Sequence, residues 1–159
     1  MKHLPDLPTV VIDTREQTPL PISKLSTETG TLYSGDYSVK GMEEVFAIER
    51  KTIADLVGSL TSGRDRFMNE LHRLRGYRFR RLLIVGSRND IKTGNYRSRT
   101  KPRAVLASLA AVEALFDIPA TFSPDQTQAA LTVEQWAFWS WREHRKSFAK
   151  PTPTPAWAV

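Results

Sequence analysis

Apolar and polar residues alternate in two short runs within the first third of the chain. The runs Tyr37–Val39 and Val45–Ile48 flank a Lys40–Gly41 turn. Val, Phe and Ile favour a pleated surface, and the glycine of the turn tolerates positive φ, so the pattern predicts a β-hairpin. In that hairpin Asp36 lies at the head of the first strand and Glu49–Lys51 at the end of the second. If the strands pair antiparallel, these polar side chains converge at one edge of the sheet.

Apolar spacing predicts the remaining elements. A helical period of three and four residues begins after Thr52 and ends at Gly63. Further helices are predicted over Arg64–Arg75, Arg103–Phe116 and Gln126–Lys146, and further strands over Thr9–Asp13, Arg81–Gly86 and Ile118–Ser123. Residues 17–31, with two prolines and many hydroxyls, are predicted as a loop with at most one short helical turn. Residues 87–101 have no apolar period and are also predicted as a loop.

The order of these elements predicts a three-layer α/β/α domain with a central mixed sheet. The chain of 159 residues has the length of a single domain. We assign this domain to residues 9–148, after an N-terminal extension of residues 1–8. The Pro- and Thr-rich residues 149–159 are predicted to form an extended or disordered tail.

Asp36, Glu49 and Lys51 together offer the groups that phosphodiester hydrolysis needs. Two carboxylates are hard oxygen ligands of the kind that Mg²⁺ prefers, and an ammonium can orient water and stabilise charge on a phosphate. Glu49 and Lys51 are two residues apart, so on a strand they share a face, whereas Arg50 points away. The stretch therefore predicts a nuclease site.

Two plainer interpretations stay open at this point. A Glu-x-Lys tripeptide at a strand end is usually a solvated ion pair. Thr52 and Asp55 are also a plausible capping pair, with Thr52 as the N-cap of the following helix. The combination of Gly35-Asp36, Glu49-Arg50-Lys51 and Asp55 favours the catalytic interpretation.

That combination resembles the signature of the XPF-type structure-specific DNA endonucleases, in which Gly-Asp precedes Glu-Arg-Lys, three further residues and Asp. The likeness extends upstream to Val10–Glu16 (VVIDTRE) and downstream to Asp55–Arg64, and it covers residues 9–146 in all. It implies a restriction-endonuclease-like fold. It also implies a Mg²⁺ cofactor, for which Mn²⁺ is expected to substitute.

The resemblance further implies roles for individual residues. Asp36 and Glu49 would hold the metal, with the backbone carbonyl of Arg50 as a third ligand. Lys51 would act on the attacking water. Asp13 could add another carboxylate, although capping of the following turn explains this residue equally well. The predicted catalytic set is therefore Asp36, Glu49, Lys51 and Asp13, and the supporting set is Arg15, Glu16, Arg50 and Asp55.

Positive charge is concentrated in one segment. The net charge is +6, yet residues 64–103 hold thirteen Lys and Arg against three acids, and the remaining residues hold ten against fourteen. A basic segment beside an acidic remainder is typical of a polyanion binder, and cations around an aromatic suit phosphate contact and base stacking. The alternatives are a solvated basic face and a flexible surface loop. The predicted DNA-binding residues are Arg64, Arg66, Arg88, Lys92, Tyr96, Arg97, Arg99 and Lys101.

Composition excludes several other functions. The chain has no cysteine, so disulfides, thiolate metal sites and a cysteine nucleophile are absent. Its three histidines lack metal-ligand spacing. No apolar run approaches the ~20 residues that span a bilayer, and the first residues lack the apolar core of a signal peptide. We therefore expect an intracellular protein, cytoplasmic or associated with DNA, that has no membrane partner.

These observations predict a Mg²⁺-dependent DNA endonuclease, and the resemblance implies branched or flap-like DNA as its substrate in repair or recombination. A non-catalytic DNA-binding or scaffolding subunit is the alternative, and a basic RNA-binding protein is a weaker one. We expect a homodimer, because XPF-type nuclease domains pair and because the alanine-rich helix and Trp136, Trp139 and Trp141 offer apolar surface. Many members of that family carry a tandem helix-hairpin-helix domain after the nuclease domain. We do not expect residues 147–159 to supply one, which leaves room for a separate DNA-targeting protein.

Overall fold

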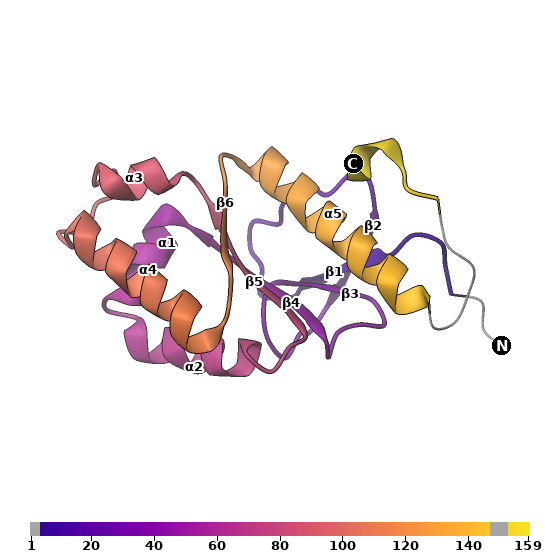
Figure 1. Cartoon of the computed structure of the whole chain (residues 1–159), viewed down its shortest axis with the longest axis horizontal. Coiled ribbons are helices and arrows are strands. Elements are labelled where there is room, and N and C mark those ends of the chain that lie inside the picture. Colours follow the sequence, from indigo (N-terminus) through magenta and orange to yellow (C-terminus); the bar gives the residue numbers. More distant parts are fainter. Residues whose placement is uncertain (1–3, 147–152) are drawn as a thin grey trace.

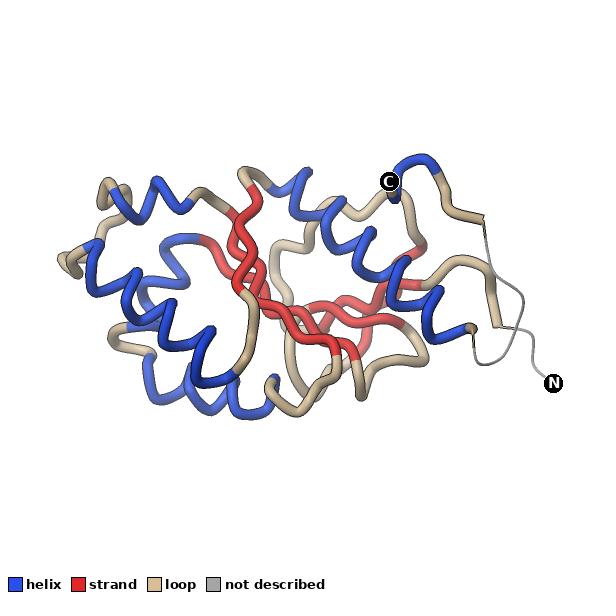
Figure 2. The backbone as a smooth tube through the Cα atoms, viewed as in Figure 1, coloured by secondary structure: helices blue, strands red, loops and turns tan. Residues whose placement is uncertain are grey.

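A mixed sheet of six strands runs through the middle of the protein in the computed structural model, which describes residues 4–146 and 153–159 (Figure 1, Figure 2). The strands are β1 (Thr9–Asp13), β2 (Ser26–Gly30), β3 (Tyr37–Val39), β4 (Phe46–Thr52), β5 (Phe79–Val85) and β6 (Ala120–Ser123). They lie in the order β2-β1-β3-β4-β5-β6. β3 is antiparallel to both of its neighbours, and the other neighbouring strands are parallel.

Helices cover both faces of this sheet. They are α1 (Ile53–Leu60), α2 (Arg64–Leu74), α3 (Arg88–Lys92), α4 (Pro102–Phe116), α5 (Gln126–Arg145) and the short 3-10 helix η1 (Ala156–Ala158). α1, α2, α3 and α4 lie on one side of the sheet, and α5 lies on the other (Figure 1). The predicted three-layer α/β/α fold with a mixed sheet is confirmed. No helix in the described part of the chain is both long and apolar enough to span a membrane.

Alternation along the central strands builds a separate core on each face. Leu82 and Ile84 of β5 pack with α1, α2 and α4, whereas Leu83 packs with α5. All three are fully buried, which explains why this strand reads as a continuous apolar run. On β4, Ile48 belongs to the core under α5. Because side chains alternate along a strand, the next residue, Glu49, faces the layer of α1 and α2.

The predicted hairpin is present, but its connection is longer than expected. Tyr37 of β3 pairs with Ile48 of β4, and residues 40–45 join the two strands in place of a two-residue turn. Gly41 has a φ of 86°, which suits the positive φ predicted for it. β4 continues beyond Ile48 because residues 49–52 pair with β5 on its other side. The strand therefore carries the polar residues of the motif on a rigid frame.

The prediction of loops was wrong for part of two segments. Residues 17–31 contain β2, which pairs with β1 in parallel, and its polar sequence is mostly exposed because β2 is an edge strand. Residues 87–101 contain α3, which begins with a capping box between Ser87 and Asp90. Both elements are five residues long and mostly exposed, so apolar periodicity could not reveal them.

The prediction of an extended or disordered tail is wrong for Ala156–Ala158. Ala156–Ala158 form η1, which packs against α5. Trp157 lies edge-on to Phe138 of α5, with ring centroids 5.7 Å apart. Residues 149–152 of the predicted tail lie outside the described residues. Trp157 therefore anchors this end of the chain. The Pro- and Thr-rich composition of the segment did not indicate this contact.

The three tryptophans of α5 make contacts within the chain. Trp141 is buried, and its indole N–H donates to the carbonyl of Pro5 at 2.9 Å. Trp136 is partly buried against the core under α5. Trp139 stays 45% exposed, although its indole N–H donates to the carbonyl of Ala158 at 3.1 Å. The apolar surface that these residues leave open is therefore smaller than the sequence suggested.

Candidate active site

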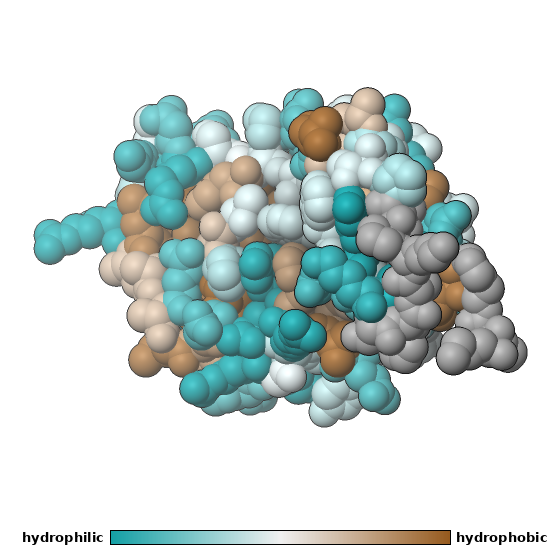
Figure 3. Space-filling model, turned by 45° about the vertical axis from the view of Figure 1, so that its right-hand side comes forward, coloured by the Kyte–Doolittle hydropathy of each residue, from teal (hydrophilic) through white to brown (hydrophobic). Residues whose placement is uncertain are grey.

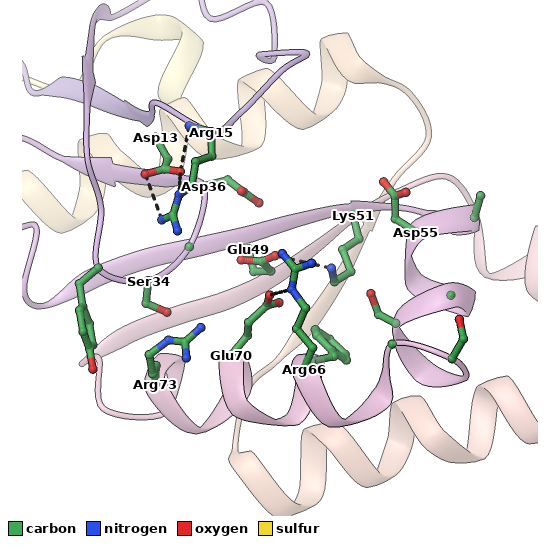
Figure 4. A pocket seen from close by; sticks show the side chains of 18 residues that line it. Asp13, Arg15, Ser34, Asp36, Glu49, Lys51, Asp55, Arg66, Glu70 and Arg73 are labelled. Atoms are coloured by element: carbon green, nitrogen blue, oxygen red, sulfur yellow. Dashed lines mark hydrogen bonds and ion pairs between the residues drawn. The ribbon is translucent and has the colours of Figure 1, made fainter.

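A cleft of about 570 Å³ opens between the sheet and helices α1 and α2 (Figure 4). Side chains from β1, from the segment before β3, from β4 and from both helices line it. The predicted site residues that line the cleft are Asp13, Arg15, Asp36, Glu49, Lys51, Asp55 and Arg66. The fold thus brings the whole predicted catalytic set into one cavity.

Asp36 is held in the cleft by backbone bonds on both sides. Its N–H donates to the carbonyl of Ile48 at 2.7 Å, and its own carbonyl accepts from the N–H of Asp13 at 2.9 Å. Its carboxylate accepts the N–H of Arg50 at 2.8 Å. The preceding Gly35 has a φ of 80°, and a Cβ there would lie 2.9 Å from the carbonyl oxygen of Ile48. The positive φ and the close approach of the Ile48 backbone therefore require glycine at position 35.

Glu49 and Lys51 share the strand face that looks onto α2. Their side chains are 16% and 12% exposed, and Lys51 Nζ lies 3.6 Å from Glu49 Oε1. The ammonium of Lys51 also lies 4.8 Å from the ring centroid of Phe67, a buried residue of α2. Carboxylate and ring hold the amine from two sides, since an ammonium is attracted to an aromatic face. The pair is therefore largely withdrawn from solvent, unlike an ordinary surface ion pair.

The two central carboxylates resist ionisation in this arrangement. Burial raises the pKa of Asp36 to about 6, and the hydrogen bond from the Arg50 N–H acts against the rise. Burial, and then repulsion by Asp36, raises the pKa of Glu49 to about 8, and Lys51 acts against that rise. Because burial and like charge both disfavour the ionised carboxylates, a bound cation would stabilise their charged form.

Asp13 and Arg15 form a closed unit at the rim of the cleft. The buried carboxylate of Asp13 accepts Arg15 Nε at 2.7 Å and the N–H of Leu32 at 2.9 Å. Burial acts to raise the pKa of Asp13, but the hydrogen bonds from Arg15 and Leu32 hold it below its ordinary value. Both carboxylate oxygens are occupied in this way. This geometry favours positioning of Arg15 and of the Leu32 segment over metal binding by Asp13.

Glu16 and Arg50 meet on the opposite face of β4. Arg50 donates to both carboxylate oxygens of Glu16, at 2.7 and 3.1 Å, and also to the carbonyl of Thr18 at 3.1 Å. Both side chains are nearly buried. This fork ties the turn after β1 to the strand that carries Glu49, and the supporting role of the two residues stays a prediction.

Asp55 lies on the exposed side of α1, where that helix borders the cleft. Its N–H donates to Thr52 Oγ1 at 3.1 Å, so Thr52 is the N-cap that the sequence predicted. The bond uses the backbone of Asp55, and its carboxylate remains directed at the rim of the cleft (Figure 4). Helix capping therefore accounts for the threonine at position 52. It does not account for the carboxylate at position 55, because the cap uses only the backbone of that residue.

Sequence reasoning missed two side chains of α2 that line the cleft, Glu70 and Arg73. Together with Arg66 they form one helix face (Figure 4), and Glu70 Oε1 forms an ion pair with Arg66 Nε at 3.3 Å. Glu70 adds to the forces that raise the pKa of Glu49. The signal was available, because positions 66, 70 and 73 repeat at helical spacing directly beside the buried stripe of Phe67, Leu71 and Leu74.

The predicted DNA-binding residues divide between two places. Arg66 lines the cleft, whereas the members of the set between residues 88 and 101 do not. Arg97, Arg99 and Lys101 are exposed. Tyr96 differs from the expectation of a ring open for base stacking: it packs against the core, and its hydroxyl donates to the carbonyl of Thr100 at 2.7 Å. The remaining members, Arg64, Arg88 and Lys92, are exposed outside the cleft.

Comparison with known proteins identifies the kind of domain that carries this cleft. The family described as "ERCC4 domain" matches residues 12–135. The chain belongs to the ERCC4 domain family. Among curated protein sequences, none matches the chain.

This ERCC4 domain is also similar to solved structures of XPF from Aeropyrum pernix. To the structure described as a complex with DNA it is 27% identical, with a TM-score of 0.69 over 86% of this chain and 66% of that chain. To a second structure of XPF it is 27% identical, with a TM-score of 0.70 over 88% of this chain and 68% of that chain. The ERCC4 domain spans about two thirds of these chains. An XPF-type nuclease domain with a restriction-endonuclease-like fold is thereby confirmed.

The donor set of the ERCC4 domain suits a hard divalent cation. Among the described residues, no three His, Cys, Asp or Glu side chains form a metal cluster by themselves. Asp36 and Glu49 supply two carboxylates with raised pKa values, and neither forms an ion pair with an arginine of the described residues. Mg²⁺ commonly takes only one or two protein carboxylates and completes its shell with water and substrate oxygens. The residues present therefore fit such an ion, although Asp13, which is saturated by hydrogen bonds, does not fit as a further ligand.

Proposed function

We propose that this ERCC4 domain is a Mg²⁺-dependent DNA endonuclease. The observation that carries the proposal is the convergence of Asp36, Glu49 and Lys51 in one cleft, where burial raises the pKa of both carboxylates and Asp36 raises that of Glu49 further. A repulsive pair of buried carboxylates lowers stability unless a cation neutralises it, so such a pair is typical of a functional site.

Asp36, Glu49 and the backbone carbonyl of Arg50 would hold Mg²⁺, or Mn²⁺ in its place. The bound ion would lower the pKa of water and neutralise charge on the phosphodiester. Lys51 would stabilise negative charge that develops on the phosphate and orient the attacking water. Glu49, at 3.6 Å, and the ring of Phe67 keep the Lys51 ammonium in place for this role. Asp55 and Arg15 would support the rim of the site.

The proposed substrate is branched or flap-like DNA met during repair or recombination. Similarity to a structure of XPF in complex with DNA supports DNA as the ligand. Arg66 and Arg73, which line the cleft, supply cations for the phosphates beside the site. The exposed cations at residues 97–101 would extend this contact outside the cleft.

A non-catalytic DNA-binding or scaffolding subunit is the second candidate. A non-catalytic subunit would be expected to lack one or more of the site residues. In this chain Asp36, Glu49 and Lys51 all line the same cavity, which favours the enzyme. We further propose a homodimer through this domain as the working form. A separate DNA-targeting protein is proposed to direct it to its substrate.

Cleavage of a forked DNA duplex tests the proposed function. We expect the wild-type protein to cut the fork in Mg²⁺ or Mn²⁺ and to be inactive with a chelator. Glu49→Gln should bind the same DNA and leave it uncut. A wild-type protein that binds the fork but does not cut it in either metal would favour the non-catalytic subunit.

A further inference from the structure

Tyr33 is the exposed aromatic side chain of the cleft. It is 77% exposed and lines the cleft three residues before Asp36. Of the other large apolar side chains that are exposed in the described part of the chain, none lines this cavity. No hydrogen bond to its hydroxyl is formed by the described residues. A ring left open at the rim of a catalytic cavity is available for contact with the substrate.

The backbone on both sides of Tyr33 is fixed. Leu32 and Ser34 are only 4% and 7% exposed. The N–H of Leu32 donates to Asp13 at 2.9 Å, and its carbonyl accepts Arg15 Nη2 at 2.9 Å. The closed Asp13–Arg15 unit thus anchors the segment that presents Tyr33. A ring displayed from an ordered backbone loses little conformational entropy when it binds.

The position of Tyr33 along the cleft can be read from its neighbours. Figure 4 shows Ser34 and Arg73 toward one end of the cavity, Glu49 in the middle and Asp55 at the far end. Tyr33 adjoins Ser34 in the chain. Its phenol also contributes, after burial, to the raised pKa of Tyr77 in the turn after α2. Tyr33 therefore lies at the Arg73 end of the cleft, away from Asp55.

We propose that Tyr33 stacks on an unpaired base near the phosphate that enters the cleft, and so makes the cleft prefer DNA with a single-stranded segment. This inference rests on the proposed function and names a residue that selects the substrate. An exposed aromatic ring recognises the face of a base, which a splayed strand offers and a continuous duplex hides between base pairs. Arg73 at the same end supplies a cation for the neighbouring phosphate.

Binding to forked DNA in a metal-free buffer with chelator tests the inference without cleavage. Two forks are compared, one with normal bases in its single-stranded arms and one with abasic sites at the arm positions next to the junction. Tyr33→Ala should weaken binding of the normal fork about 5- to 150-fold, the range expected when one stacked base loses its aromatic partner. It should change binding of the abasic fork less than about twofold, because no base is present to stack.

Three control variants separate ring stacking from other effects. Tyr33→Phe keeps the ring and should bind the normal fork like the wild type, whereas Tyr33→Leu, which is apolar without a ring, should bind like Tyr33→Ala. Leu7→Ala removes an exposed apolar side chain of the segment before β1, outside the cleft, and should have no effect.

The possible outcomes distinguish this inference from the proposed function. Equal loss of affinity on the normal and abasic forks, or unchanged binding by Tyr33→Ala, overturns the stacking role while the nuclease proposal stands. A loss in Tyr33→Phe equal to that in Tyr33→Ala would replace stacking with a hydroxyl contact and would also overturn it. A wild-type protein that binds neither fork would overturn the proposed function, and the inference with it.

Discussion

The carboxylate of Asp36 accepts a hydrogen bond of 2.8 Å from the backbone N–H of Arg50. The two residues come from neighbouring stretches of an antiparallel pair, so this bond sets the distance between Asp36 and the next strand. Glu49 and Lys51 lie on either side of Arg50 in that strand. One backbone group therefore places the first carboxylate of the motif relative to the other two functional side chains.

Removal of either carboxylate should abolish cleavage. Asp36→Asn and Glu49→Gln each take one charge from a two-carboxylate site, which weakens binding of a hard cation directly. DNA binding should remain nearly intact. We expect Mg²⁺ titrations to show activity that is lost or shifted to much higher metal concentration. Turnover at the wild-type rate by Asp36→Asn and Glu49→Gln at low Mg²⁺ would refute their assignment as metal ligands. Lys51→Ala should be inactive but keep its metal affinity.

Stability should fall as pH rises in the absence of metal. The pKa values of Asp36 and Glu49 are raised from 3.8 and 4.5 to about 6 and about 8, so between about pH 4 and 8 the folded protein keeps protons that the unfolded chain has released. The free energy of unfolding then decreases with pH across this window. Relative to Glu49→Gln, the wild type should lose on the order of 2 kcal/mol between about pH 5 and 8.

Thermal unfolding at these two pH values measures this difference. Mg²⁺ should stabilise the wild type more at the higher pH, because the ion competes with protons for the same carboxylates. An identical pH dependence of wild type and Glu49→Gln would show that Glu49 does not hold its proton in the folded protein.

The Arg50–Glu16 fork should contribute strongly to stability. Arg50→Ala leaves the nearly buried carboxylate of Glu16 without its partner, which typically costs about 3 to 5 kcal/mol. Arg66→Ala is the matched control, since Arg66 pairs with Glu70 at the surface and such pairs are worth about 0 to 1 kcal/mol. Urea unfolding of both variants checks the prediction, and a similar small loss of stability in both would contradict it.

The exposed cations after α3 should bind DNA through phosphates. Changing Arg97, Arg99 and Lys101 together to Ala should weaken binding without a change in sequence preference. The slope of log affinity against log salt should flatten by about 0.9 for each duplex phosphate that the variant no longer neutralises. An unchanged slope in the triple variant would move the electrostatic contact elsewhere, first to the segment from Arg64 to Arg81.

The domain should form a homodimer at micromolar concentration. Trp139 and Leu115 are the exposed large apolar side chains of α5 and α4 in the described part of the chain. On the face drawn in Figure 3, hydrophilic side chains predominate and hydrophobic ones gather in small separate groups. An interface built on such a surface needs polar contacts beside apolar ones. Sedimentation equilibrium decides the matter, and a monomer mass with and without DNA would rule the dimer out.

The spacing of apolar residues along the chain was sufficient to predict the central strands and the long helices. Leu82, Leu83 and Ile84 face two different cores, so the strand had to be apolar throughout, and the apolar stripe of α2 faces one core, so its period is helical. β2 and α3 left no such trace. Each is short and mostly exposed, and each is held by partners far along the chain or by a local cap, so their residues need not be apolar.

For the candidate site, the motif by itself determined which side chains are close. A hairpin that pairs antiparallel must bring Asp36 near Glu49, and a strand must turn Glu49 and Lys51 to one face. Only the tertiary structure decided what surrounds them. The burial that raises the pKa values of the two carboxylates, the ring of Phe67 beside Lys51 and the ring of Tyr33 at the rim all depend on how α2 and the segment before β3 pack against the sheet. Strand and helix periods report the neighbours of a residue within its own element, whereas a cleft is made where separate elements meet, and their relative placement is set by the packing of the whole core.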